Sequence, residues 1–371
     1  MGRKITSLDG GSCIVGRLPR GCKLCTEGAK MVLFVTGLCD SSCYYCPLSQ
    51  DRAGEDAVFA DEMPVTTMDD VLFEAKSIRS EGAGISGGDP LCQLERTIEY
   101  IRRLKKEFGT NYHTHLYTSK TDISDVELKM LKTAGLDEIR FHPQTKDWSG
   151  IKRAVQNGFH VGIEVPAIPG KQEELFELAR RAEETGVSFL NINELEASET
   201  NFAALLALGM RLTNLESASI EGSASTALEV LEWAKDNLND LSVHFCSARF
   251  KDAVQMRRRL ERRLEQTIRE FEERDDEDPL VVVGVVRAPH GKVLTTSELK
   301  FIYQTLRRRY DVPPELLNLD EKRKRIEIAP WVLEEIADTL RNSISTVSDL
   351  EIGIAFEYPT WDRLQTMFNP L

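Results

Sequence analysis

Three cysteines stand close together early in this chain of 371 residues, at Cys39, Cys43 and Cys46. Thiolates are the ligands that hold iron–sulfur clusters, and a short loop can bring three of them onto one cluster. Three ligands for four irons leave one iron with open coordination positions, as a catalytic metal site requires. A closed structural site needs a fourth ligand, which the next residue, Pro47, cannot supply. The loop therefore favours a [4Fe–4S] cluster. The alternatives are zinc with a ligand from elsewhere, such as Cys22 or Cys25, and a chance group of free thiols.

Strand-like and helical segments alternate along the first two thirds of the chain and would position this loop. The strand-like segments cover residues 31–38, 82–88, 112–119, 137–143, 160–170, 188–196 and 241–247. Helical patterns at 93–109, 124–135 and 171–186 end on glycine, which readily takes the positive φ of a helix C-cap. This alternation predicts βαβ units and a parallel sheet. We therefore expect an α/β fold with a full or partial (β/α)6-type barrel, and a site at the carboxyl ends of its strands.

The chain divides into four predicted parts. Residues 1–30 form a cysteine-containing extension, and residues 31–247 form the barrel. Residues 248–278 read as one long charged helix that ends in an acidic stretch and Pro279. Residues 279–371 alternate strands and helices and predict a small C-terminal α+β domain, with helices at 296–309 and 331–342. We expect a role for that domain as a lid, in docking or in dimerisation.

Composition limits the functions that this chain can have. The formal net charge of −13 does not favour broad binding to nucleic acid, which needs a cationic surface. No apolar run approaches the length of a membrane span, and the first residues lack the layout of a secretory signal. We therefore expect a cytoplasmic protein with no membrane partner. In that compartment its eight cysteines would be metal ligands or buried thiols rather than disulfides.

Two motifs together resemble those of the radical S-adenosylmethionine (SAM) superfamily. The first is the cysteine loop, whose spacing is C-x3-C-x-aromatic-C and which follows the first barrel strand. The second is the segment 85–90, Ile-Ser-Gly-Gly-Asp-Pro, at the end of the second strand, which is similar to the GGE-type motif of the family. The resemblance covers roughly residues 30–200. Within the superfamily the chain is most similar to archaeal proteins related to pyruvate formate-lyase activating enzymes.

The resemblance implies a fold, two cofactors and a reaction. SAM would bind the open iron of the [4Fe–4S] cluster, and the reduced cluster would cleave it to a 5′-deoxyadenosyl radical that abstracts hydrogen from a substrate. The electron would come from a donor such as ferredoxin or flavodoxin. The substrate stays open between a protein to be activated or modified, a small molecule and RNA. The alternative function is a non-catalytic iron–sulfur or zinc protein that uses the barrel for binding or electron transfer.

The resemblance also implies contacts to SAM at the strand ends. Gly87 and Gly88 would let the backbone approach the methionine part of the cofactor. Asp89, which replaces the glutamate that is usual in the family, would keep an anion beside the amino group, and Tyr45 would pack near the adenine. The further candidates, which end later strands, are Ser119, Arg140, Glu164 and Asn193. For Asp89 the alternative is a strand-to-helix turn, and for the others it is a buried structural hydrogen bond.

Four further cysteines predict a second metal site. They are Cys13, Cys22, Cys25 and Cys246. The pair Cys22 and Cys25 has the C-x2-C spacing of a knuckle that grips a metal from a tight turn. Four thiolates would make a closed site suited to an auxiliary [4Fe–4S] cluster or a structural zinc, with His244 able to replace one of them. The alternative is free thiols packed in the core.

Overall fold

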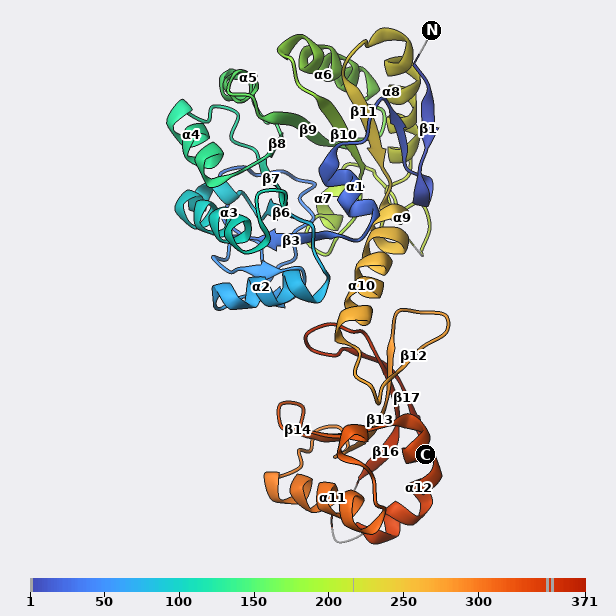
Figure 1. Ribbon diagram of the computed structural model, residues 1–371. Coiled ribbons are helices and arrows are strands. Elements are labelled where there is room, and N and C mark those ends of the chain that lie inside the picture. The colour runs from blue at the N-terminus through green and yellow to red at the C-terminus, as the bar shows by residue number, and fades with distance from the viewer. Residues whose placement is uncertain (1–2, 216, 345–346, 348–349) are drawn as a thin grey trace. The chain divides into compact units, whose positions relative to one another are not determined.

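The computed structural model describes residues 3–215, 217–344, 347 and 350–371, and the chain forms two compact units, Met1–Arg259 and Leu260–Leu371 (Figure 1). In the described residues, the first unit is built on an eleven-stranded sheet in the order β1-β2-β11-β10-β9-β8-β7-β6-β3-β4-β5. At one edge β4 (Phe59–Ala60) and β5 (Met63–Pro64) form a short antiparallel hairpin. The strands from β11 to β3 are parallel to one another. They are β3 (Lys30–Phe34), β6 (Gly82–Ser86), β7 (His113–Thr118), β8 (Glu138–Phe141), β9 (His160–Ala167), β10 (Phe189–Glu194) and β11 (Ser242–Cys246). The predicted parallel α/β barrel is confirmed. Because β3 and β11 lie at opposite ends of the parallel run, the barrel is partial.

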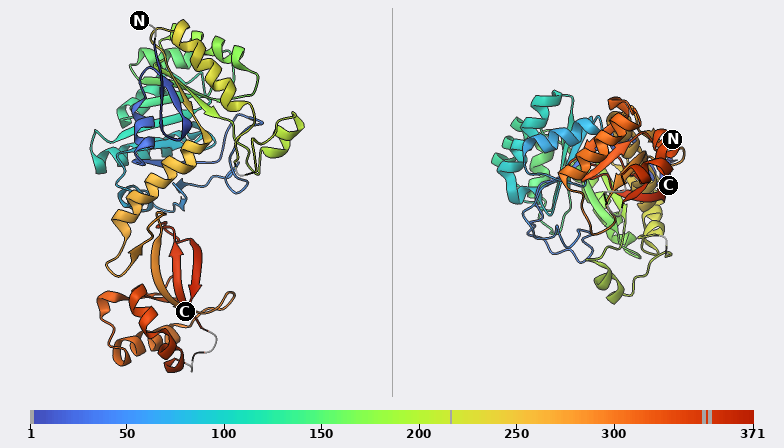
Figure 2. Two further views of the ribbon diagram at one scale, coloured as in Figure 1. Left: turned by 90° about the vertical axis from the view of Figure 1, so that its right-hand side faces the viewer. Right: turned by 90° about the horizontal axis from the view of Figure 1, so that it is seen from below.

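Helices connect these strands and cover the outer face of the sheet (Figures 1 and 2). They are α2 (Met68–Ser77), α3 (Leu94–Phe108), α4 (Asp125–Ala134), α5 (Ser149–Gln156), α6 (Gln172–Thr185) and α8 (Ser223–Asn237). Their ends follow local sequence signals. Helix α4 begins with a capping box in which Ser124 and Glu127 satisfy each other's backbone N–H groups, and it ends at Gly135 with φ of 104°. The boundaries predicted from sequence for α3, α4 and α6 are confirmed to within a residue or two.

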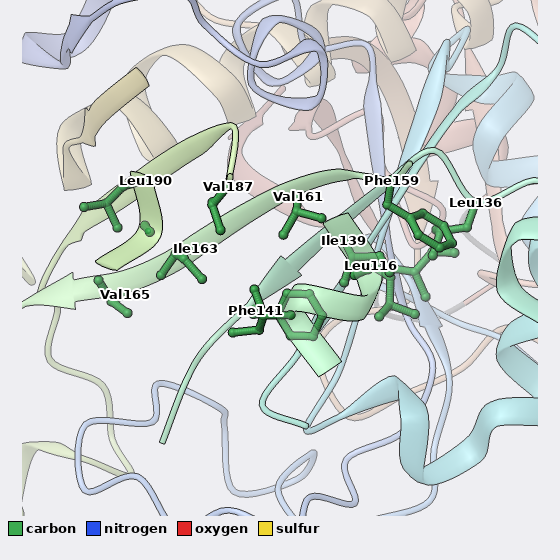
Figure 3. Packing of buried hydrophobic residues seen from close by; sticks show 14 of the residues in the cluster. Leu116, Leu136, Ile139, Phe141, Phe159, Val161, Ile163, Val165, Val187 and Leu190 are labelled. Carbon is green, nitrogen blue, oxygen red and sulfur yellow. The ribbon is translucent and has the colours of Figure 1, made fainter. Parts of the chain in front are cut away.

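The parallel strands separate an apolar layer from a polar interior. Successive side chains along a strand point to opposite faces. In β8 and β9 the residues Ile139, Phe141, Val161 and Ile163 are fully buried in the hydrophobic core, and Figure 3 shows this packing. Among the alternating positions of the same two strands are the charged residues Glu138, Arg140 and Glu164. The core therefore lies between sheet and helices, while the concave side of the sheet is lined by polar groups.

The N-terminal extension contributes to the sheet, which the sequence analysis did not predict. Strands β1 (Ile5–Ser7) and β2 (Cys13–Val15) form an antiparallel hairpin, and β2 pairs antiparallel with β11. The hairpin lies beside α8 (Figure 2). Helix α1 (Arg20–Thr26) then leads into β3 and packs against β3, β6 and β7.

The long helix expected over residues 248–278 is confirmed as far as Thr267 and wrong beyond it. A continuous helical run consists of α9 (Ala248–Phe250), a π-helical turn η3 (Lys251–Met256) and α10 (Arg257–Thr267), and a short strand β12 (Glu273–Arg274) lies where the helix was expected to continue. Two interactions stabilise the non-helical backbone that follows α10. Phe271 is buried in a cluster of the second unit, and the carboxylate of Glu272 accepts from the backbone N–H of Arg269 at 2.9 Å. Charge pattern alone could not reveal this burial.

The described residues of the second unit form a small antiparallel sheet, against which two longer helices pack. The strand order is β14-β15-β13-β16-β17, and β12 also pairs with β13. The strands are β13 (Val281–Arg287), β14 (Leu317–Asp320), β15 (Arg325–Ile328), β16 (Glu351–Glu357) and β17 (Gln365–Pro370), and the helices are α11 (Thr296–Arg309) and α12 (Pro330–Ser343). The predicted α+β domain is confirmed, with β14 and β17 added at the sheet edges. Among the described residues of the whole chain, no helix combines the length and apolarity that a membrane crossing needs.

Candidate active site

A cavity of about 640 Å³ lies within the first unit and joins the cysteine loop to the polar interior of the barrel. Cys39, Cys43 and Cys46 all line it. Cys39 and Cys46 are exposed, and Cys43 is half-buried. Three thiols on one cavity wall are the soft donors that an iron–sulfur cluster requires. The residues present therefore fit the cluster that the loop predicts.

Hydrogen bonds from a distant segment hold the cysteine loop in place. The hydroxyl of Thr200 donates to the carbonyl of Leu48 at 2.6 Å, and the side-chain amide of Asn201 donates to the carbonyl of Tyr45 at 3.1 Å. Both donors precede helix α7 (Phe202–Ala207), in the connection after β10. This segment supports the loop from outside. No local sequence pattern indicates that role, because it depends on residues far apart in the chain.

Gly87 and Gly88 are glycines because two backbones approach closely here. A Cβ atom on Gly87 would lie 2.3 Å from the carbonyl oxygen of Thr36, and one on Gly88 would lie 2.4 Å from that of Leu38. The N–H of Gly88 donates to the Thr36 carbonyl at 2.8 Å, and the N–H of Asp89 donates to the Leu38 carbonyl at 2.7 Å. The two-glycine turn is therefore fastened to the backbone that leads into the cysteine loop, and both glycines line the cavity.

Asp89, which we expect beside the cofactor, is hydrogen-bonded to groups of its own chain. Asp89 is buried and is not among the residues that line the cavity. Its carboxylate accepts from the hydroxyl of Thr118, from the backbone N–H and hydroxyl of Ser119, and from the N–H of Leu91, at 2.9–3.0 Å. The last bond caps the short helix that begins at Pro90. The strand-to-helix turn, which was the alternative, is the arrangement found, and Asp89 positions the end of β7.

Tyr45 and Ser119, which we expect to contact the cofactor, line the cavity. The hydroxyl of Tyr45 lies 2.9 Å from Nε2 of His142 and accepts from the side chain of Gln144 at 3.2 Å. Burial raises the pKa of Tyr45 to about 12, so the phenol stays protonated. Ser119 is hydrogen-bonded to Ser41 in the cysteine loop at 2.9 Å. The ring of Tyr45 thus forms a fixed wall beside the cysteines.

Arg140, Glu164 and Asn193 also line the cavity, where they form one hydrogen-bonded network. Arg140 is almost fully buried and donates to Glu138 at 2.6 Å and to Glu164 at 2.9 Å, and Asn193 donates to Glu164 at 3.0 Å. Burial alone would raise the pKa of Glu138, but Arg140 and other partners lower it to about 2. The pKa of Glu164 is lowered for the same reason. Both carboxylates therefore stay ionised, and Arg140 is committed to two anions of its own chain.

The four further cysteines do not form one group. Cys22, Cys25 and Cys246 line the cavity. Cys13 does not: it lies on β2 and packs against the hydrophobic core, so its inclusion in the site is corrected. Cys22 and Cys25 lie on helix α1 rather than in the tight turn that their spacing suggested. None of the eight cysteines forms a disulfide.

Two charged side chains of the cavity were missed by the sequence analysis. Lys30 is buried at the start of β3 and points into the cavity. Lys251 lines the cavity from the π-helical turn η3, where it pairs with Glu196. Lys30 is the first residue of an otherwise apolar strand, and a charged residue in that position could have indicated a role in the site. The π-helix, a feature frequent at functional sites, leaves no such signal.

The fold and the site define a partial β/α barrel protein with a thiol-lined cavity at the carboxyl ends of its strands. The model of the radical SAM superfamily matches residues 33–192, and that of a domain of unknown function, DUF8061, matches residues 280–371. A protein of Methanocaldococcus jannaschii, named provisionally as a glycyl-radical enzyme activating enzyme, is 36% identical over 375 residues that cover 96% of this chain and 93% of that protein. This chain belongs to the radical SAM superfamily.

Solved structures match this chain at lower identity. SuiB of Streptococcus suis, crystallised with S-adenosylmethionine, matches with a TM-score of 0.42 and 13% identity over 61% of this chain and 53% of that chain. Coproporphyrinogen III oxidase of Escherichia coli, described as a radical SAM enzyme, matches with a TM-score of 0.37 and 12% identity over 88% and 82% of the two chains. Membership of the superfamily implies SAM and a [4Fe–4S] cluster as cofactors.

Proposed function

We propose that this protein holds a [4Fe–4S] cluster on Cys39, Cys43 and Cys46 and cleaves SAM reductively to start a radical reaction. When bound, the two cofactors supply a 5′-deoxyadenosyl radical that abstracts a hydrogen atom from the substrate. One observation carries the proposal: the three thiols, the two-glycine turn and the polar barrel interior share a single cavity of about 640 Å³. Superfamily membership supports it.

The protein's own side chains would bind and orient the cofactor and keep water from it. Tyr45, fixed by His142, offers a flat wall for the adenine. Gly87 and Gly88 present backbone atoms to the cavity without side chains in the way. Ser119 links the cysteine loop to the end of β7, and Asp89 holds Ser119 in that place. Asp89 would thus help to position the cofactor through Ser119.

For the substrate, we propose a glycine residue of a partner enzyme. The relative from Methanocaldococcus jannaschii supports this, because it is similar over nearly the whole chain and is named for the activation of glycyl-radical enzymes. An electron donor such as ferredoxin or flavodoxin would be the second partner. We further propose a cytoplasmic location, where the thiols of the cluster loop stay reduced. A small molecule or RNA as substrate is an alternative that the labelling experiment below distinguishes.

The test of SAM cleavage is the release of 5′-deoxyadenosine. Anaerobically reconstituted protein, given reductant and SAM, should release it, and Cys43→Ala should abolish the release. Cys92→Ala is the matched control, since Cys92 is a half-buried thiol outside the cavity lining and should not be needed. Intact cluster absorption with no release of 5′-deoxyadenosine would favour the non-catalytic function in binding or electron transfer.

The test of the substrate is deuterium transfer. Candidate pools are labelled with deuterium, one at a time: a glycyl-radical enzyme deuterated at glycine, small metabolites, and RNA. The true substrate should transfer deuterium into 5′-deoxyadenosine. Transfer from a small-molecule pool and none from the glycine-labelled protein would refute the proposed protein substrate and leave SAM cleavage standing.

A further inference from the structure

Three cysteines outside the cluster loop meet on the wall of the same cavity. Cys22 and Cys25 come from helix α1, and Cys246 comes from the end of β11. Residues three apart in a helix lie on one face, so α1 presents both of its thiols together. Along β11, His244 and Cys246 are two residues apart, share a face of the sheet and both line the cavity. The fold thus places three thiols from two distant segments on the wall of one cavity.

Two buried cations lie beside these sulfur atoms. A guanidinium nitrogen of Arg140 donates to Sγ of Cys22 at 3.4 Å. The ammonium of Lys30 lies near Cys25 and donates to the hydroxyl of Tyr117 at 3.4 Å. Lys30 is only 5% exposed, and no ion pair with a carboxylate involves it in the part of the chain that the structure describes. Hydrogen bonds from cations suit sulfur that carries negative charge, as metal-bound thiolate does.

If the protein has the proposed function, free thiols are poorly suited to this cavity. An active site that forms a reactive radical must exclude side reactions. Three S–H groups on its wall would be hydrogen donors in reach of that radical. Metal binding removes these protons, because a cysteine ligand must be deprotonated. A metal on the three sulfurs would therefore protect the radical, whereas leaving them as thiols would expose it.

We propose that Cys22, Cys25 and Cys246 hold a second, thiophilic metal centre on the wall of the cavity. Its metal is either an auxiliary iron–sulfur cluster or zinc, since both take thiolate ligands. His244 could supply a nitrogen ligand. Its Nδ1 is hydrogen-bonded to the side-chain oxygen of Asn191, so Nε2 is the nitrogen that would bind the metal. Arg140 and Lys30 would donate hydrogen bonds to the ligand sulfurs and fix their orientation. Cys13 is not a ligand.

Metal binding would draw these side chains closer together. Among the described residues, no three His, Cys, Asp or Glu side chains are already arranged around one ion. The same holds for Cys39, Cys43 and Cys46, although superfamily membership implies a cluster there. Both groups therefore require side-chain movement when they take up metal.

Metal content tests the proposal without any activity measurement. The protein is reconstituted anaerobically, and iron, sulfide and zinc are quantified per chain. We expect about four irons for the first cluster, and either about four more or about one zinc for the second centre. Either result supports the proposal and identifies the metal. Cys22→Ala, Cys25→Ala and Cys246→Ala should each lose the second metal and keep the first four irons.

Two controls separate this proposal from the proposed function and from misfolding. Cys13→Ala and Cys92→Ala remove thiols outside the cavity lining and should keep both metals. A triple variant, Cys39→Ala with Cys43→Ala and Cys46→Ala, should keep the second metal while losing SAM cleavage. If the folded wild-type protein takes up only about four irons and no zinc, and Cys22→Ala and Cys25→Ala leave that content unchanged, the second centre does not exist. SAM cleavage would survive that outcome.

Discussion

Replacing Gly88 by alanine tests whether the two-glycine turn sets the position of the cluster loop. The new Cβ would lie 2.4 Å from the carbonyl oxygen of Leu38 and 2.6 Å from that of Gly37. An ordinary contact begins at 3.4 Å, so the two backbones must separate by about 1 Å. Both contacts are to main-chain atoms, which cannot move aside as a flexible side chain can. The loop that carries Cys39 follows directly and would move with them.

The expected effect is larger on activity than on stability. Overpacking of this size costs about 1–3 kcal/mol of unfolding free energy. A displacement of about 1 Å at a catalytic group reduces rates by about 100-fold. The assay is the rate of 5′-deoxyadenosine formation at equal iron content, with the free energy of unfolding measured by urea. Gly170→Ala is the control: Gly170 has φ of 75° and open space around its Cβ position, so alanine there strains the backbone without pushing on the cluster loop. A Gly88→Ala rate within a few-fold of the control would refute the reasoning.

Three further predictions concern stability. Arg140→Met leaves the fully buried Glu138 without its guanidinium partner and should cost about 3–5 kcal/mol in urea unfolding, and a loss below about 1 kcal/mol would show that the carboxylate has other compensation. Thr118→Val removes a buried hydroxyl donor to Asp89 and should cost about 1–3 kcal/mol; equal unfolding free energies for variant and wild type would contradict this. Burial lowers the pKa of His113 from its ordinary 6.5 to about 4, so the unfolded chain takes up a proton first and stability should fall as the pH drops from 6.5 to about 4. His113→Leu should weaken that dependence in urea midpoints measured across this window, and an unchanged slope would count against the assignment.

The parallel sheet was predictable from sequence because each strand is a short apolar run bounded by turn residues. The cluster loop was predictable because its three ligands are neighbours in the chain. Asp89 was assigned to the cofactor because sequence shows only its neighbours, whereas its main partners, Thr118 and Ser119, end the next strand. Cys13 was misplaced for a similar reason: its position depends on the pairing of β2 with β11, which no local pattern indicates.

The pairing of β2 with β11 also constrains the order in which the chain can fold. Residues 13–15 pair with residues 243–245, so the sheet edge near the N-terminus cannot be completed until the last barrel strand has been synthesised. Contacts between such distant segments form late, because a long loop must close first. During that interval Cys22 and Cys25 of helix α1 would line a cavity that still lacks β11, the strand that carries Cys246. We therefore expect the newly made chain to be most vulnerable to oxidation and to binding a wrong metal just before β11 docks.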